Sequence, residues 1–376
     1  MFTPKRNGGQ LPFLVHEGKL VMGDEKTFYR LEGEGGYIIP GMIDTHIHGL
    51  EGCDFMDGDL VHYEFIAENL LKYGVTGFLA TTRAESMEQL QVILRQLVHF
   101  YDRNQMNKKA ARMIGIHLEG PWLNRTYKGA QKAEHLIAPL MKDAEAIYDI
   151  TGDRLKLVTL APEMSGIEPF IDFFRKRNIR ISAGHTAATY DEFNHAIQRG
   201  VNRTTHSFNA MGGIHHRKPG VMEAAILNDR VYCEVIADGL HVHPEIVKWL
   251  ITQKGKNRWV AISDASAAAG LPDGTYKMAG KTLVKEGRSV KLEGQNTLSG
   301  SAITLLDALH FLHKELQLDL GFVLHGLSMN PCDSLGIPNK GRFKNGYDAD
   351  YVLLNHDLNV RSTYLEGELV YKKEVK

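Results

Sequence analysis

The segment YIIPGMIDTHIHG, residues 37–49, shows the pattern that the middle of the chain repeats. It is a short apolar run that ends in polar residues, and one isoleucine separates its two histidines, His46 and His48. Residues i and i+2 of a β-strand point to the same side. Two imidazoles on one face, beside Asp44, can serve as metal ligands. The segment therefore predicts a buried strand that carries a metal-binding pair at its carboxyl end.

Further apolar runs of the same kind follow, and helical patterns separate them. Short strands that alternate with helices indicate a parallel sheet. Eight such units fit a closed (β/α)8 barrel, a fold of about 250 residues. We expect strands at Tyr37–Asp44, Thr76–Thr82, Met113–Glu119, Leu155–Pro162, Arg180–His185, Val201–His206, Val231–Ala237 and Trp259–Asp264, and helices at Tyr63–Tyr73, Met87–Tyr101 and Ile167–Arg177 and from Tyr190, Pro219 and Pro244.

A doubly wound open sheet is the alternative architecture for this α/β pattern. Polar residues cluster at the carboxyl ends of the expected strands, where barrel enzymes carry their chemistry. No GxGxxG or Walker A sequence follows the first strand. Both observations favour the barrel.

The two ends of the chain differ from its middle. Phe13–Leu31 and Asp350–Tyr371 contain short alternating segments that Gly and Asp residues separate. We expect residues 1–38 and 340–376 to form one small β-sandwich domain beside a barrel of residues 39–339. The stretch GLPDGTYKMAGKTLVKEG, residues 270–287, predicts a β-hairpin insertion near residues 270–298.

The composition excludes several classes of protein. The chain has 376 residues, 43% hydrophobic and 24% charged, and a formal net charge of −1, so no basic field for nucleic acid exists. No apolar run approaches the ~18 residues of a membrane span, and Met1–Gly9 lacks the apolar core of a signal peptide. Three widely spaced cysteines suggest neither a disulfide framework nor a thiolate zinc site. We expect a cytoplasmic protein without nucleic-acid or membrane partners.

Metal-type side chains end several of the expected strands. One histidine at a strand end is more often an ordinary hydrogen-bonded residue, and one carboxylate there can cap a helix. Several at the same end of separate strands predict a divalent metal site, and histidine with carboxylate suits Zn, Fe, Ni or Mn. The candidate ligands are His46, His48, Glu119, His185 and His206, and Asp264 is a sixth polar group.

Eight motifs resemble the amidohydrolase superfamily, and within it the deacetylases of N-acetylated amino sugar 6-phosphates. They are PGMIDTHIHG, HLEGPWLN, SAGHT, THSFNAM, ADGLHVHP, SDASAAAGLPDG, LSGSAITL and MNPCDSLGI, and they cover nearly the whole chain. The resemblance implies a metal-dependent barrel with a small β-domain.

The resemblance also implies a reaction. The acetamide of N-acetyl-D-glucosamine 6-phosphate would be hydrolysed to D-glucosamine 6-phosphate and acetate, with one or two divalent metals, Zn or Fe, per chain. A divalent metal lowers the pKa of bound water towards ~7, and the hydroxide attacks the carbonyl. Asp264 would accept the proton and return it to the amine.

The histidine pair predicts two metal positions. The first would use His46, His48 and Glu119, and the second would use Glu119, His185 and His206, so that Glu119 bridges them. The alternative is that the pair stays empty of metal.

Substrate contacts are implied residue by residue. Arg217 matches a phosphate-binding arginine that reaches across a homodimer interface, although as a residue it could be an ordinary exposed one. His241 would contact the substrate and polarise its carbonyl, whereas from its surroundings alone it could cap a helix. The sugar site would be lined by Ala130, Gln131, Asn209, Ala210, Leu298, Ser299 and Gly300.

Other functions stay open at this point. A deacetylase for the galactosamine epimer, or another amidohydrolase acting on N-acyl amino acids or dihydropyrimidines, would have the same metal ligands. A non-catalytic barrel scaffold is expected to lose ligands, and none of the six polar groups is missing here.

Overall fold

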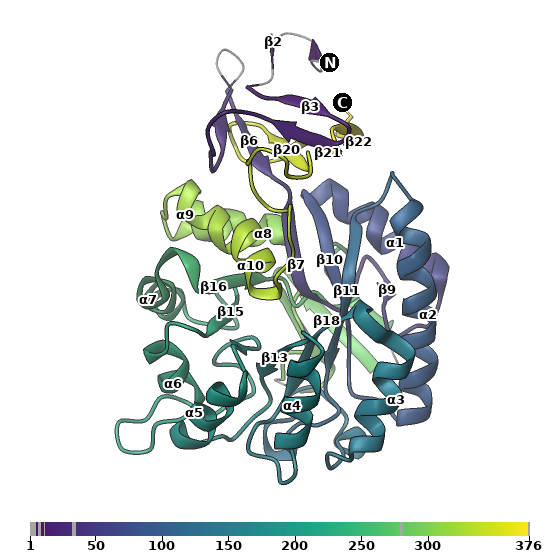
Figure 1. Cartoon of the computed structure of the whole chain (residues 1–376), viewed down its shortest axis with the longest axis vertical. Coiled ribbons are helices and arrows are strands. Elements are labelled where there is room, and N and C mark those ends of the chain that lie inside the picture. The colour runs from purple at the N-terminus through teal and green to yellow at the C-terminus, as the bar shows by residue number, and fades with distance from the viewer. Residues whose placement is uncertain are drawn as a thin grey trace.

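The computed structural model describes residues 5–6, 9–10, 12–31, 35–278, 281–295 and 297–374. The remaining positions of the expected terminal domain and of the expected insertion lie outside the described residues. Figure 1 shows a barrel with helices around it and, at one end, a group of smaller sheets that contains both ends of the chain. None of the helices in the described ranges is both long and apolar enough to cross a membrane.

The barrel is a parallel sheet of eight strands, which confirms the predicted (β/α)8 fold. Each strand pairs with the next one of the barrel along the chain, as right-handed βα repeats require. The strands are β7 (Met42–Ile47), β10 (Val75–Thr82), β11 (Arg112–Glu119), β12 (Leu155–Leu160), β13 (Arg180–Ala183), β14 (Arg203–Thr204), β15 (Tyr232–Ile236) and β16 (Trp259–Ile262).

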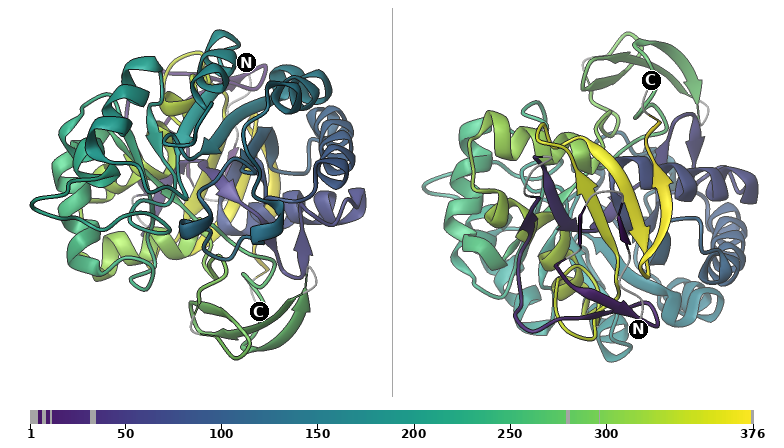
Figure 2. Two further views of the ribbon diagram at one scale, coloured as in Figure 1. Left: turned by 90° about the horizontal axis from the view of Figure 1, so that it is seen from below. Right: turned by 90° about the horizontal axis from the view of Figure 1, so that it is seen from above.

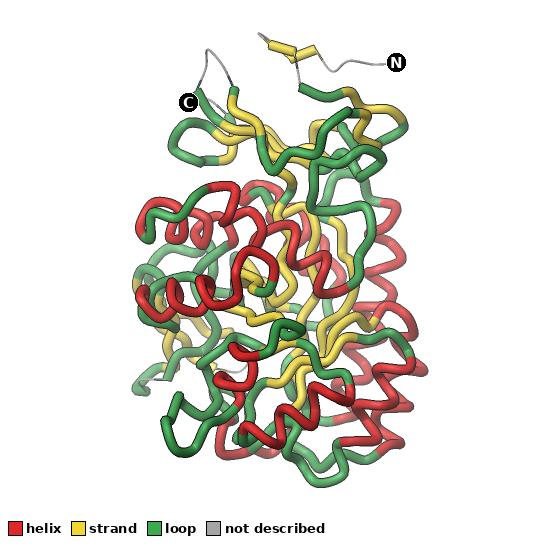
Figure 3. The backbone as a smooth tube through the Cα atoms, turned by 60° about the vertical axis from the view of Figure 1, so that its left-hand side comes forward, coloured by secondary structure: helices red, strands yellow, loops and turns green. Residues whose placement is uncertain are grey.

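Helices cover the outside of the barrel (Figure 3). In α2 the residues Leu90, Leu94 and Leu97 share one face and are buried against the sheet, and Ser86 caps its first turn. The helices are α1 (Leu60–Leu70), α2 (Met87–Met106), α3 (Met141–Thr151), α4 (Glu168–Lys176), α5 (Tyr190–Arg199), α6 (Val221–Leu227), α7 (Pro244–Lys254), α8 (Leu305–His310), α9 (Leu320–Leu324) and α10 (Asn330–Leu335).

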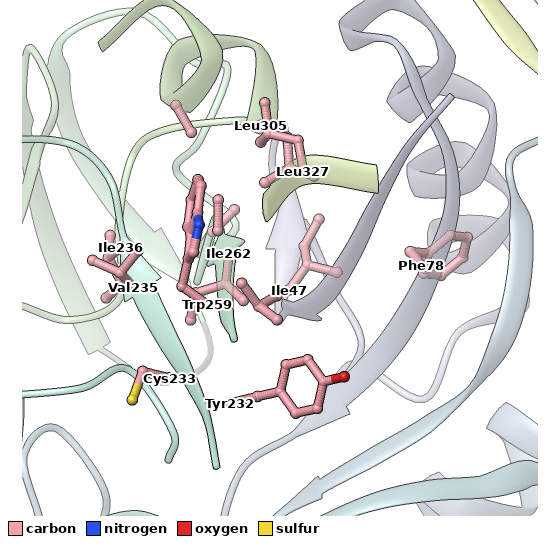
Figure 4. Packing of buried hydrophobic residues seen from close by; sticks show 14 of the residues in the cluster. Ile47, Phe78, Tyr232, Cys233, Val235, Ile236, Trp259, Ile262, Leu305 and Leu327 are labelled. Carbon is pink, nitrogen blue, oxygen red and sulfur yellow. The ribbon is translucent and has the colours of Figure 1, made fainter. Parts of the chain in front are cut away.

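The first and last barrel strands meet at a seam. Ile47 and Ala265 form a parallel bridge, and the Asp264 N–H donates to the His46 carbonyl at 2.9 Å. Behind the seam Trp259 and Leu327 belong to one continuous apolar cluster (Figure 4). Burial of this apolar surface stabilises the closed barrel.

The first predicted strand is in fact two strands. β6 (Tyr37–Pro40) belongs to the terminal sheet and β7 to the barrel, and Gly41 lies between them. The Gly41 N–H donates to the Asp350 carbonyl at 3.0 Å, and a Cβ at this position would lie 2.0 Å from Thr76 Oγ1. The prediction of one strand from Tyr37 to Asp44 was wrong because the apolar pattern continues across the crossing.

The terminal segments form interleaved sheets. A five-stranded antiparallel sheet has the order β22-β21-β20-β6-β5, so strands from both ends of the chain lie side by side (Figure 2). Phe13, Leu20 and Tyr351 pack together in a separate apolar cluster. The strands are β1 (Lys5–Arg6), β2 (Gly9–Gln10), β3 (Leu14–His16), β4 (Lys19–Val21), β5 (Tyr29–Arg30), β20 (Tyr351–Leu354), β21 (Val360–Leu365) and β22 (Glu368–Lys372).

An insertion follows the last barrel strand. It is an antiparallel sheet of β17 (Gly274–Met278), β18 (Lys281–Glu286) and β19 (Ser289–Leu292), which extends from one side of the barrel (Figure 2). Leu283 and Val290 pack against Ala268 and Ala302. A short pair, β8 (Gly49–Leu50) and β9 (Cys53–Asp54), follows β7. These additions border the carboxyl ends of the strands.

We expect Gly41→Ala to lower the free energy of unfolding by at least about 2 kcal/mol, because the new Cβ collides with the buried side chain of Thr76. Thermal and denaturant unfolding measure the change. Gly23→Ala is the matched control, since no heavy atom lies within 4 Å of its added Cβ. Equal stability of the two variants would contradict this account of the crossing.

Candidate metal centre and active site

The carboxyl ends of the barrel strands surround a cavity of about 410 Å³. All six polar groups predicted as ligands or proton carrier are buried. They come from five strand ends and form two groups, each with ligand atoms within 4.8 Å of one another.

The first group consists of His46, His48 and Asp264. The Nε2 atoms of the two histidines lie 3.2 Å apart. Asp264 Oδ1 lies 3.4 Å from His46 Nε2 and 3.2 Å from His48 Nε2. The seam of the barrel therefore brings a carboxylate of β16 to the histidine pair of β7.

The second group consists of Glu119, His185 and His206. Glu119 Oε1 lies 3.2 Å from His185 Nε2 and 3.1 Å from His206 Nε2. Glu119 also faces the first group, at 3.7 Å from His46 Nε2 and 3.6 Å from His48 Nε2. Glu119 thus lies between the two groups.

The ring orientations suit a cation. Nδ1 of His46 faces Glu234 Oε2 at 3.2 Å, and Nδ1 of His48 and His185 faces the carbonyls of Thr81 and Tyr127 at 3.2 and 2.8 Å. Each Nδ1 therefore donates a proton to an oxygen, and each Nε2 points to the centre, where it binds a proton or a metal ion. Lone pairs that face one another at 3.1–3.2 Å repel unless a proton or a metal lies between them. The donor set of histidine and carboxylate fits Zn, Fe, Ni or Mn.

The carboxylates are ionised in spite of their burial. Burial raises the pKa of Asp264, but His46 and His48 outweigh it and lower that pKa to about 2. The pKa of Glu119 is well below its usual value, because hydrogen bonds from His185 and His206 outweigh burial. Burial lowers the pKa of His46, but Asp264 and the two glutamates raise it to about 9. The centre concentrates negative charge that a cation can balance.

Three of the six candidate ligand and proton-carrier residues have strained backbones. His185, His206 and Asp264 have φ of +49°, +32° and +48°. Non-glycine residues rarely adopt this region, and each instance costs about 1–3 kcal/mol. The conformation ends each strand and turns the side chain over the barrel mouth.

Two other histidines of the motifs, His117 and His243, make hydrogen bonds outside the two ligand groups. His117 lies below the centre, where its Nε2 contacts Thr159 Oγ1 at 2.8 Å. Burial holds the pKa of His117 well below its usual value, so the ring is neutral. His243 caps helix α7 by accepting from the Glu245 N–H.

Most of the residues predicted to bind the sugar line the same cavity. His241 among them is held by Asp238, whose Oδ2 lies 2.6 Å from His241 Nδ1. Asp238 was not predicted, although it stands three residues before His241 in ADGLH. The lining includes Ala130, Gln131, Asn209, Ala210, His241, Leu298, Ser299 and Gly300.

Gln131 contacts a metal-ligand candidate directly. Its Nε2 donates to Glu119 Oε2 at 2.7 Å, and its Oε1 accepts from the Ala84 N–H at 3.0 Å. The amide therefore orients Glu119, a role that its position in the KGAQ motif did not reveal.

Arg217 lies on an exposed loop, residues 212–219, between β14 and α6. It is absent from the described residues that line the cavity of its own chain. The single chain does not bring this residue to the predicted phosphate site.

The profile of the Amidohydrolase family matches residues 37–370, most of the chain and all of the barrel strands. The chain belongs to the amidohydrolase family. The amidohydrolase family is metal-dependent, and the two groups described above are the candidate metal-binding groups of this chain.

Individual relatives match over most of their length. The chain is 31% identical to N-acetylglucosamine-6-phosphate deacetylase of Lysinibacillus sphaericus, over 90% of this chain and 87% of the relative. It is also 31% identical to N-acetylgalactosamine-6-phosphate deacetylase of Escherichia coli O157:H7, over 90% and 89%. A crystal structure of N-acetylglucosamine-6-phosphate deacetylase from Thermotoga maritima superposes with a TM-score of 0.86 at 34% identity, over 96% of this chain and 94% of that one.

We expect each zinc ion, at one hundred times its dissociation constant, to stabilise the chelator-treated protein by about 2.7 kcal/mol, because metal binds only the folded state. His185→Asn should lose most of this gain, since His185 is one of the three members of the second group. Thermal unfolding with and without zinc measures it. His243→Asn keeps a capping side chain on α7 and should respond like the wild type. A full zinc response in His185→Asn would exclude that residue as a ligand.

Proposed function

We propose that the protein is an N-acetylglucosamine-6-phosphate deacetylase, which hydrolyses N-acetyl-D-glucosamine 6-phosphate to D-glucosamine 6-phosphate and acetate. The observation that carries this proposal is the pair of adjacent ligand groups with Glu119 between them and Asp264 at their border. The deacetylases among its relatives support the substrate class. A non-catalytic scaffold would have no reason to retain six converging ionisable groups.

The protein's own residues supply positioning and proton transfer. A bound divalent metal would supply Lewis acidity and lower the pKa of a water molecule. Asp264 is ionised at neutral pH and would accept a proton from a water molecule as the oxygen of that water bonds to the acetyl carbonyl carbon. It then returns the proton to the amine nitrogen as the amide C–N bond breaks. His241, fixed by Asp238, would contact the substrate from the cavity wall.

The phosphate is bound by Arg217 of a second subunit in this proposal. The arginine is exposed on its own chain, and its loop precedes α6. Large apolar residues are also exposed on the loop and on the two helices that follow it: Ile214 on the loop, Leu227 at the end of α6 and Trp249 on α7. Exposed apolar side chains beside a functional arginine are typical of a protein interface. A homodimer would bury them and place the arginine over the partner's cavity.

The galactosamine epimer is the second candidate substrate. The relative that acts on it is as similar in sequence as the first relative above, 31% in both cases. The two sugars differ only in the configuration of one hydroxyl group.

The remaining assignments are also proposals. The free state of Cys53, Cys233 and Cys332 supports a reducing compartment, the cytoplasm. The crossing at Gly41 supports a division into a terminal β-domain and a barrel, which we predicted as residues 1–38 with 340–376 and residues 39–339; β6 extends the terminal sheet to Pro40.

Acetate release from a panel of N-acetylhexosamines tests the function. The panel contains the N-acetylated glucosamine and galactosamine epimers, each with and without the 6-phosphate. The protein is loaded with zinc or ferrous iron before the assay. The proposal expects the highest kcat/KM for N-acetylglucosamine 6-phosphate. Preference for the galactosamine ester would select the second candidate, and no acetate from any sugar would exclude both.

Asp264→Asn should lower kcat by at least ~100-fold, because the amide cannot accept the proton of the attacking water. Its similar size should leave zinc content and KM near those of the wild type. Steady-state kinetics on the zinc-loaded variant measure both. Turnover close to the wild-type rate would remove Asp264 from the proton transfer.

Arg217→Ala should weaken transition-state binding of the phosphorylated sugar by about 2 to 4 kcal/mol and narrow its advantage over the free sugar. The ratio of kcat/KM for the two sugars measures the loss. Lys218→Ala removes a neighbouring exposed charge and is the control. An unchanged ratio in Arg217→Ala would show that another group binds the phosphate.

We also expect two metal ions per chain. After saturation with zinc and dialysis, metal analysis should give a stoichiometry near two, in line with a pair of ions about 3.5 to 4 Å apart. In the double variant His46→Asn/His48→Asn it should fall to about one, because only the group around Glu119 stays complete. One ion per chain in both proteins would mean that the histidine pair does not hold metal.

A further inference from the structure

A fully buried carboxylate lies directly behind the candidate metal centre. Glu234, in the middle of β15, has no exposed surface. Its Oε2 faces His46 Nδ1 at 3.2 Å and accepts the backbone N–H of His206 at 3.1 Å. One oxygen atom therefore contacts one member of each ligand group.

A buried arginine holds this carboxylate in place. Arg203, on β14, donates from Nε to Glu234 Oε1 at 2.6 Å. Its other nitrogens contact Ser334 Oγ at 2.5 Å and the hydroxyl of Thr45. The guanidinium is thus fixed from three sides, and it leaves only Oε2 of Glu234 to face the centre.

A charge pair in the barrel interior needs an explanation beyond stability. Taking two ions out of water is costly, and apolar residues of similar volume often stabilise such a position better. The contacts of Oε2 give the reason for the carboxylate.

The two contacts of Oε2 control different features of the ligands. At His46 the carboxylate keeps the proton on Nδ1, so that Nε2 is free to bind metal. At His206 it holds a backbone with φ of +32°, which is unfavourable for this residue. Nδ1 of His206 has no hydrogen-bond partner among the described residues, so the main chain has to orient this ring.

We propose that Glu234, held by Arg203, is a positioning residue that supports both metal positions at once, through the ring of His46 and the backbone of His206. This inference rests on the proposed function only in that the two groups bind metal. It does not depend on the sugar. The other two histidines are held differently, by the carbonyls of Thr81 and Tyr127, so they should not respond to changes at Glu234.

Zinc affinity without substrate tests this inference. The first variant is Glu234→Gln, and the second is Glu234→Gln/Arg203→Gln, which removes both buried charges and so avoids an unpaired guanidinium. Competition with a chromogenic chelator gives the dissociation constant of each zinc ion. We expect both constants to rise by about 10 to 100-fold in each variant. His46→Asn should instead weaken mainly the first group.

A structural control separates positioning from general destabilisation. Asp350→Asn also removes the acid of a buried pair, with Lys340 at 2.7 Å, but near the terminal sheet. It should lower the unfolding temperature and leave both zinc constants unchanged. Zinc dissociation constants equal to those of the wild type in the folded Glu234 variants would overturn the proposal. If only one of the two constants rose, Glu234 would not support both metal positions. Absence of zinc binding or acetate release by the wild-type protein would instead contradict the proposed function.

Discussion

The closure of the barrel between β7 and β16 is the constraint on which the site depends. The Asp264 N–H that donates to the His46 carbonyl at 2.9 Å is both a bond of the seam and the contact that sets Asp264 beside the histidine pair. These two residues are 218 positions apart in sequence, so no local preference could join them. Five of the strands bring one or two of these side chains each to the mouth, and only a closed ring makes them converge. The large apolar cluster that fills and surrounds the barrel is therefore also what keeps the ligands together.

The converging charges of the site destabilise the folded state of the metal-free protein. Histidine nitrogens at 3.1–3.2 Å, ionised buried carboxylates and three residues with positive φ all raise its free energy. The surroundings oppose this with directed hydrogen bonds: Thr81 and Tyr127 accept from ring N–H groups, Gln131 donates to Glu119, and Glu234 bridges two ligands. Such a site is preorganised to bind a metal cation. The free energy of folding of the rest of the barrel offsets the cost of this arrangement.

The sequence predicted those parts of the structure that repeat or that stand at strand ends. Eight apolar runs predicted the barrel strands, and the polar residues at the ends of five of these runs are the six groups that the structure brings together. The division of Tyr37–Asp44 into β6 and β7 was missed because the apolar pattern continues across Gly41. Glycine is required at this position because of Thr76, which is distant in sequence. The third strand of the insertion was missed as well. The contact between Gln131 and Glu119 depends on the path of a loop, and loop paths follow from tertiary packing rather than from residue pattern.

The partners behind the ligands were the least predictable part, and Glu234 shows why. In the run VYCEVIA a single glutamate among apolar residues is a visible signal, since a charged residue in a buried strand needs a partner. The sequence pattern does not identify the residue that pairs with Glu234. Arg203 lies on the neighbouring strand, at a place fixed by the pairing of β14 with β15, and Thr45 and Ser334 come from other elements. The sequence pattern of a strand shows that a buried charged residue needs a partner of opposite charge. Only the register of the closed sheet shows that this ion pair contacts two candidate metal ligands.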